Sequence, residues 1–236
     1  MRCSFRSFLS ADLDWHGAEA EYRRALVLAP NDGEAKLLLG YQLAVFGDLE
    51  PAIELTRQAL ATDPLRATSY RWLAPYLSGL SRLDEAERAI RRAIELQTRT
   101  ALQYRRLAII EIQRGNPQAA LAAAQQELPG VYHDFAVALA RQIGDDRRAA
   151  DAALSTLTQN HGTGFPYLVA DVYTLRKDAK ATFEWLDRAW SIRDPGIALL
   201  LFDPFMLRYK DDPRFAAFCR KVGLPVPGET SARNSN

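Results

Sequence analysis

The chain has 236 residues, 48% of them hydrophobic and 25% charged, and 30 basic against 29 acidic side chains leave a formal net charge of +1. This composition supports a buried core and excludes a disordered chain. Near-neutral charge argues against a general nucleic-acid coat or a polybasic membrane binder.

Further classes of protein are excluded by particular residues. Cys3 and Cys219 lie at opposite ends of the chain, so neither a disulfide framework nor a cysteine zinc site is predicted. No segment approaches the roughly 20 apolar residues of a membrane span, and no apolar stretch of about 7–15 residues follows the N-terminal arginines as in a secretory signal. We therefore expect a cytoplasmic protein that binds neither membrane nor nucleic acid.

Small and apolar residues recur at a fixed period along the chain. Several independent columns share an interval of 34 residues, which indicates structural repeats. These columns are Ala18, Ala52, Ala86 and Ala120; Ala25, Ala59 and Ala93; Leu39, Leu73 and Leu107; Gly40, Ala74 and Ala108; and Pro30 and Pro64.

Each repeat is predicted to be two antiparallel helices. In the unit over residues 33–66, Gly47 and Asp48 supply the turn, with Asp48 as the N-cap and Pro51 in the first turn of a helix over 50–61. Ala52 and Ala59 are two helical turns apart and share one face. A single pair cannot bury its apolar face, so the units must stack.

The remaining units follow in chain order. A partial unit over 1–32 contributes one clear second helix around Ala18 and Ala25. Complete units are predicted at about 67–100, 101–129, 130–158 and 163–192. Turn-forming residues over 158–164 predict a loop between the last two units.

The residue pattern within the units resembles the tetratricopeptide repeat (TPR) family over roughly residues 10–192. That resemblance implies an all-α, right-handed superhelix of about five helix pairs, forming a single solenoid over residues 1–227. It also implies a non-catalytic scaffold for protein–protein interaction. The matches in the unit 67–100 are Tyr70, Leu73, Ala74, Leu77, Ala86, Ile90 and Ala93.

The closing segment, residues 193–227, carries three Asp-Pro pairs and ends at Gly223-Leu224-Pro225. It is similar to the C-terminal TPR regions of bacterial winged-helix regulators and nucleotide cyclases. We expect it to contain a capping helix, apolar on Phe215, Phe218 and Val222, that shields the last repeat. A polar tail over 228–236 is predicted to be disordered.

No constellation of residues predicts catalysis, a metal site or a cofactor. The three histidines, His16, His133 and His161, lie in different units and have no partner at metal-ligand spacing. No Gly-x-Ser-x-Gly elbow is present. The glycines after His161 lack the lysine of a phosphate-binding loop. We therefore predict that the chain is not an enzyme.

A basic centre makes the concave groove the candidate site. Residues 66–106 contain nine arginines against four acids, a net charge of +5. Carried over by position, the family's groove contacts nominate Tyr41, Arg71, Arg99 and Arg105 for an acidic peptide or partner domain, because arginine suits carboxylates. The alternative is that these arginines are ordinary solvated helix residues.

Two further alternatives concern the partner. The TPR clamp that holds chaperone tails is disfavoured, because only Arg106 matches its residues. The closing segment suggests instead the sensory or regulatory portion of a bacterial signalling or transcription-regulatory protein. An unpaired repeat face at the N-terminus would then allow self-association into a homo-oligomer.

Overall fold

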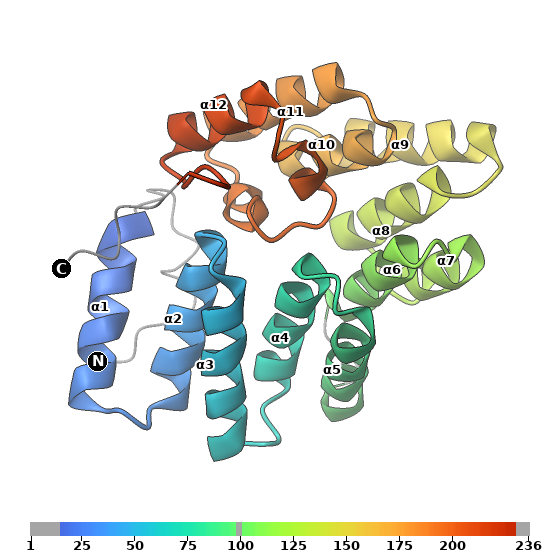
Figure 1. The fold of residues 1–236 in the computed structure, drawn as a ribbon. Coiled ribbons are helices and arrows are strands. Elements are labelled where there is room, and N and C mark those ends of the chain that lie inside the picture. Colours follow the sequence, from blue (N-terminus) through green and yellow to red (C-terminus); the bar gives the residue numbers. More distant parts are fainter. Residues whose placement is uncertain (1–14, 98–100, 230–236) are drawn as a thin grey trace.

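The computed structural model describes residues 15–97 and 101–229, and every regular element within them is helical (Figure 1). The repeats consist of α1 (Trp15–Leu28), α2 (Gly33–Val45), α3 (Leu49–Thr62), α4 (Ala67–Gly79), α5 (Leu83–Leu96), α6 (Gln103–Gln113), α7 (Pro117–Gln125), α8 (Val131–Gln142), α9 (Arg147–His161), α10 (Pro166–Leu175) and α11 (Ala179–Ser191). The closing segment contains two short 3₁₀ helices, η1 (Pro195–Leu199) and η2 (Met206–Tyr209), and α12 (Pro213–Val222).

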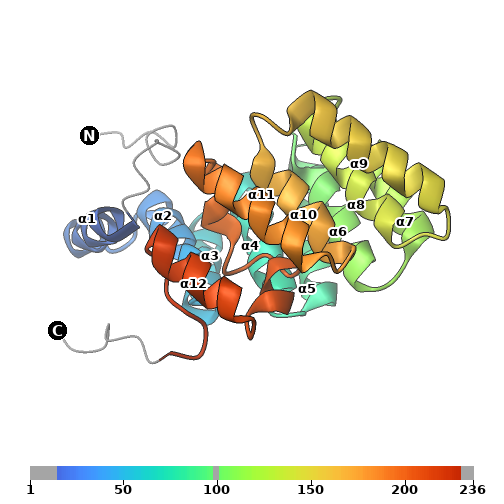
Figure 2. The same ribbon diagram turned by 90° about the horizontal axis from the view of Figure 1, so that it is seen from above.

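Five antiparallel helix pairs stack into a curved solenoid. The pairs are α2–α3, α4–α5, α6–α7, α8–α9 and α10–α11, and α1 packs against α2. The first members of successive pairs contact one another and form the inner, concave row (Figures 1 and 2). The predicted all-α solenoid is confirmed.

The columns of small residues mark where helices approach one another closely. Ala52, Ala86 and Ala120 are fully buried on the second helices of their pairs. On the facing helix α2, a Cβ at Gly40 would lie 3.2 Å from the carbonyl oxygen of Ala52. A larger side chain would therefore push α2 and α3 apart, which explains the 34-residue recurrence of Gly and Ala.

Short polar side chains fix several helix starts. Asp32 accepts hydrogen bonds from the backbone N–H groups of Glu34 (2.8 Å) and Ala35 (3.2 Å) at the start of α2. Asp146 and Asp178 cap α9 and α11 by the same chemistry, at 2.9 and 3.0 Å. Each cap satisfies N–H groups that have no partner within the helix.

The loop predicted over residues 158–164 is shorter than expected. Helix α9 continues through His161, because the backbone N–H of Gly162 still bonds the carbonyl of Thr158 at 3.0 Å. The His161 Nε2 atom lies 3.0 Å from the Asp134 carboxylate on α8. This tertiary contact outweighs the turn preference of the polar residues. Gln159 and Asn160 are exposed, so their side chains stay in water although the helix continues.

The closing segment folds back into the concave side of the solenoid. Its central part lies between the first and the last repeats, as the orange and red ribbon in Figure 1 shows. Phe202 meets Tyr41 and Tyr76 edge-on, with ring centroids 6.5 and 5.6 Å apart. A Cβ at Gly79 would lie only 2.9 Å from the Phe202 carbonyl oxygen, so the segment contacts the α4 backbone directly.

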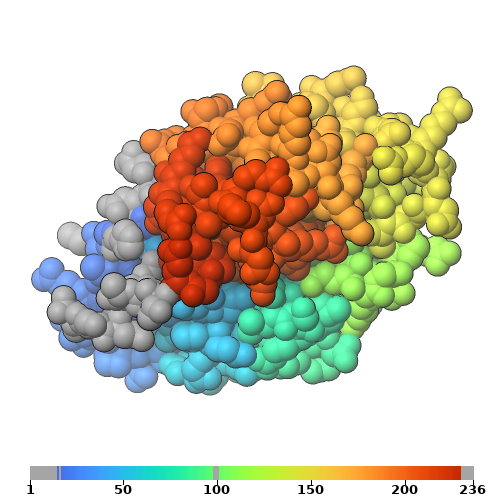
Figure 3. Space-filling model, turned by 45° about the horizontal axis from the view of Figure 1, so that its top comes forward, coloured from blue at the N-terminus to red at the C-terminus, as the bar shows by residue number. Residues whose placement is uncertain are grey.

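Helix α12 is the expected cap, and it reaches further than the last repeat. Phe215, Phe218 and Val222 are buried, as predicted. Lys221 pairs with Asp187 of α11 at 2.7 Å. At the opposite end of the array, the indole Nε1 of Trp15 donates a hydrogen bond of 3.0 Å to the carbonyl of Val222. Figure 3 shows the closing segment, in red, lying across both halves of the molecule.

The predicted tail over 228–236 falls outside the described residues except for Gly228 and Glu229. The backbone N–H of Glu229 bonds the carbonyl of Val226 at 3.1 Å, and the Glu229 carboxylate pairs with Arg220. The first 14 residues of the predicted partial unit are likewise outside the described part.

Candidate functional site

A cavity of about 310 Å³ remains where the closing segment leaves the concave surface uncovered. Its walls come from the inner helices α2, α4, α6, α8 and α10 and from the start of the closing segment. We call it the arginine pocket. It is lined by Tyr41, Arg71, Trp72, Leu102, Arg105, Arg106, Tyr132, Phe165, Leu168, Asp194, Pro195, Gly196 and Leu199.

Three of the four nominated residues meet at this pocket. Tyr41 and Arg105 are each 5% exposed, and Arg71 is half-buried. They do not line an open groove, because the closing segment covers the neighbouring concave surface. Arg99, the fourth, lies outside the described residues. Whether these side chains bind a partner stays a prediction.

Arg106 is a fourth side chain of the site, and groove positions alone did not nominate it. It is 7% exposed, and its guanidinium lies 5.3 Å from the ring centroid of Trp72. Arg105, the preceding residue on α6, lies 5.0 Å from the ring centroid of Tyr132. The sequence signal was its match to one position of the chaperone-tail clamp, which was set aside because the other clamp residues are absent.

Two acids beside the pocket, Glu127 and Asp194, accept hydrogen bonds from backbone N–H groups. The buried Glu127 carboxylate accepts from the backbone N–H groups of Leu102 (3.0 Å) and Arg105 (2.9 Å), so it caps α6. Asp194 accepts from the N–H groups of Tyr167 (2.9 Å) and Gly196 (2.8 Å). These carboxylates are held by the backbone rather than by guanidinium groups.

The pocket therefore collects three arginines, Arg71, Arg105 and Arg106, against one lining acid, Asp194. The Nε atoms of Arg105 and Arg106 are buried without a hydrogen-bond partner among the described residues. Burial, together with the charges of Arg105 and Arg71, lowers the pKa of the Arg106 guanidinium to about 9. Burial also lowers the pKa of Arg71 and of Arg105. Each shift reflects a cationic group that is poorly solvated in this fold.

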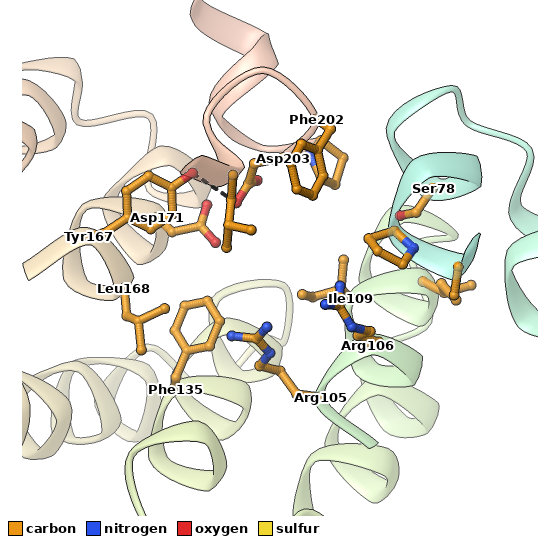
Figure 4. A pocket seen from close by; sticks show the side chains of 15 residues that line it. Ser78, Arg105, Arg106, Ile109, Phe135, Tyr167, Leu168, Asp171, Phe202 and Asp203 are labelled. Carbon is orange, nitrogen blue, oxygen red and sulfur yellow. Dashed lines mark hydrogen bonds between the residues drawn. The ribbon is translucent and has the colours of Figure 1, made fainter. Parts of the chain in front are cut away.

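A smaller cavity of about 40 Å³ shares Arg105, Arg106, Leu168 and Leu199 with the arginine pocket, and Figure 4 shows its lining. Asp171 of α10 and Asp203 of the closing segment lie opposite the two arginines, and the Tyr167 hydroxyl donates to Asp203 at 3.3 Å. Burial and the charge of Asp203 raise the pKa of Asp171 well above its usual range. Asp203 itself accepts from the N–H of Phe205 at 2.9 Å.

Four other arginines of the basic centre, Arg66, Arg82, Arg91 and Arg92, form ion pairs away from the pocket. Arg82, the residue before α5, pairs with Glu85 at 2.7 Å, and Arg92 pairs with Glu95 at 2.9 Å within α5. Arg66 pairs with Asp63 at 3.4 Å at the start of α4. The solvated-residue alternative thus describes most of the basic centre, and the pocket arginines are its exception.

The described residues contain no group of three or more His, Cys, Asp or Glu side chains that could hold a metal ion. Burial raises the pKa of the Cys219 thiol to about 12, which leaves it unreactive. In the ranges 15–97 and 101–229, no helix combines the length and apolar character needed to cross a bilayer.

Comparison with known proteins identifies the fold. No family model matches the chain, and neither does any curated protein. Among solved structures, the TPR protein YrrB, described as having an unusual peptide-binding site, has a TM-score of 0.50 and 18% identity over 77% of this chain and 97% of its own.

Two further solved structures agree. MamA has a TM-score of 0.50 and 23% identity over 71% of this chain and 92% of its own. A tetratricopeptide repeat protein of Parabacteroides merdae has a TM-score of 0.55 and 15% identity over 89% of this chain and 86% of its own. The chain therefore has the TPR fold, an α-α solenoid.

Proposed function

We propose that this chain is a non-catalytic protein-interaction module that captures an acidic part of a partner protein at the arginine pocket. The observation that carries this proposal is the convergence of Arg71, Arg105 and Arg106 on one cavity from two inner helices. Arginine offers a forked set of donors that matches a carboxylate, so a localised cluster of three favours an acidic group.

The closing segment changes how a partner would bind. An extended peptide along the concave surface would collide with the chain around Phe202, which already contacts Tyr41 and Tyr76. The space that remains accommodates a chain end or a single side chain. YrrB is a solved TPR protein described as having an unusual peptide-binding site. For this chain we propose binding at the pocket rather than along an open groove.

Affinity capture with the chain as bait tests this proposal. We expect Arg71→Glu to reduce the recovered partner at least tenfold, because a half-buried carboxylate would repel an acidic group. Arg71 is chosen because Arg105 is buried and its replacement by Glu would also disturb the fold. Arg88→Glu, an exposed position on α5, is the matched control.

Circular dichroism of both variants should match the wild type, which separates binding from folding. Equal recovery by the wild-type chain and Arg71→Glu would contradict the proposal. Loss of capture with Arg88→Glu alone would place the interaction on the outer surface instead.

A second candidate role is a self-associating regulatory portion of a bacterial signalling protein, as the closing segment's resemblance suggests. The observation that favours self-association is exposed apolar surface at one edge of the first repeats. Val27 and Leu28 are 79% and 80% exposed, and Leu65 on the α3–α4 connection is 67% exposed. The C-terminal end of α1 and the α3–α4 connection both lie along the lower edge in Figure 1.

Sedimentation velocity tests this second role. A concentration-dependent dimer that disappears in Leu28→Glu would support it, and a monomer at all concentrations would exclude it.

A further inference from the structure

We propose that the arginine pocket is a site for one carboxylate group attached to a planar apolar body, with Arg71 and Arg106 binding the carboxylate. This inference rests on the proposed function and specifies the chemistry of the ligand. Two sources carry such chemistry, the C-terminal residue of a polypeptide and a free aromatic acid, and the experiment below distinguishes them.

The need for an anion follows from uncompensated charge. A buried guanidinium is costly to leave without a counter-charge. Asp194 lines the pocket, and both it and Glu127 are bound by backbone N–H groups. Asp171 and Asp203 face the same arginines from the smaller cavity, where burial raises the pKa of both carboxyl groups and so disfavours their charged forms. Across the described part of the chain, the Nε atoms of Arg105 and Arg106 have no acceptor. A ligand carboxylate in the pocket would supply the missing counter-charge.

A carboxylate fits better than a phosphate. Phosphate sites commonly use the free backbone N–H groups of a helix N-terminus in addition to side chains. The N-terminus of α6 borders the pocket, and the carboxylate of Glu127 already occupies the N–H groups of Leu102 and Arg105 there. That carboxylate would repel a phosphate dianion, so side-chain guanidinium groups alone remain for the ligand.

The remaining walls select a planar apolar body. Trp72 forms one side beneath Arg106, and Tyr132 and Phe165 form another, with ring centroids 6.4 Å apart in an edge-to-face arrangement. Leu168 and Leu199 complete the surface. Aromatic walls favour an aromatic ligand through offset and edge contacts.

The size of the pocket limits the ligand to a small group. A volume of about 310 Å³ corresponds to roughly ten water molecules at their liquid density of about 30 Å³ each. This matches one aromatic side chain with its carboxylate, and it excludes a folded partner domain from the interior. Pro195 and Gly196 on the lining bring the closing segment into contact with any such ligand.

Isothermal titration calorimetry with the full chain and defined probes tests the inference without any protein partner. The probes are 3-phenylpropionate, N-acetylphenylalanine and their amides, with inorganic phosphate for comparison. We expect both acids to bind and each amide to bind at least tenfold more weakly, because the amide lacks the charge that the guanidinium groups require. Phosphate should bind more weakly than either acid.

The two acids distinguish the ligand's source. Binding of both supports a polypeptide C-terminus, whereas binding of 3-phenylpropionate alone supports a free aromatic acid. Failure of both acids at millimolar concentration, or equal affinity for acids and amides, would overturn the inference.

Substitution of Arg106 provides an independent measurement. Arg106→Met should weaken 3-phenylpropionate binding at least tenfold, while the melting temperature of the ligand-free chain stays equal or rises, because a poorly solvated charge is removed. A purely structural arginine would lower the melting temperature on removal. Arg88→Met is the surface control, and Arg71→Gln repeats the binding test at a half-buried position.

Unchanged binding in both Arg106→Met and Arg71→Gln would contradict the assigned residues.

The experiments distinguish a failure of this inference from a failure of the proposed function. Capture of a partner that depends on Arg71 while no small acid binds would reject only the carboxylate chemistry. Carboxylate binding with partner capture indifferent to Arg71 would reject only the partner role.

Discussion

Asp171 is a buried carboxyl group whose ionisation opposes folding. Its side chain is 1% exposed, and its Oδ1 atom has no hydrogen-bond partner among the described residues. Burial and the charge of Asp203 raise its pKa well above the usual value, and the opposing effect of Arg105 is smaller. In the folded state Asp171 therefore takes up a proton at a higher pH than in the unfolded state.

This difference predicts that Asp171 makes stability depend on pH. Because the folded chain binds more protons, its free energy of unfolding should rise relative to that of Asp171→Asn as the pH falls through the raised pKa toward the ordinary range of a carboxyl group. Each unit of raised pKa corresponds to about 1.4 kcal/mol. Chemical denaturation of the wild type and Asp171→Asn at several pH values measures this difference in the free energy of unfolding.

Asp187→Asn, at an exposed ion pair on α11, is the control for the loss of a surface carboxylate. A constant difference between wild type and Asp171→Asn at every pH would show that Asp171 has an ordinary pKa.

At the scale of elements, the closing segment depends on a close approach to α10. A Cβ added at Gly196 would lie 2.7 Å from both Cβ and Cγ of Tyr167, whose ring is buried. Gly196 also borders the arginine pocket, so the position of η1 and the shape of the pocket are coupled.

Gly196→Ala should therefore destabilise the chain by about 1–3 kcal/mol through overpacking. Gly164→Ala is the matched control, because nothing lies within 4 Å of its added Cβ. That control should be neutral or stabilise slightly by restricting the unfolded chain. Equal midpoints of urea denaturation for the two variants would show that η1 can move away from Tyr167 at little cost in stability.

The repeating elements could be predicted from the sequence because their packing is local. Gly40 and Ala52 meet within one helix pair, and recurrence of such small residues every 34 positions reports the same contact in each unit. The buried face of α12 could also be predicted, because Phe215, Phe218 and Val222 recur at helical spacing.

The folding-back of the closing segment could not be predicted in this way. The contact of Phe202 with Tyr41 joins residues far apart in sequence, and no periodic pattern encodes it. The pocket could not be predicted either, because it forms where the closing segment covers the concave surface, whereas the family's groove positions assume that this surface is open. Tyr41, Arg71 and Arg105 could be chosen by position, whereas the burial of Arg106 follows from a segment that the repeats do not describe.

At the scale of the whole molecule, the hydrogen bond from Trp15 to Val222 connects the first helix with the last across 207 residues of sequence. Trp15→Phe removes the donor while it keeps most of the apolar surface. We expect a loss of about 1 kcal/mol, with faster amide hydrogen exchange in α1 and α12.

Amides of α5 serve as the internal reference, because they lie away from this contact and should exchange unchanged. Uniform acceleration across all helices would indicate a global loss of stability rather than opening at this junction.

The junction between the two ends also constrains how such a chain can change in length. An open solenoid tolerates the gain or loss of a unit, because each repeat contacts only its neighbours. Here an additional helix pair between α5 and α6 would carry Val222 away from Trp15 and Phe202 away from Tyr76. The number of units is therefore set by closure, as the number of blades is set in a ring.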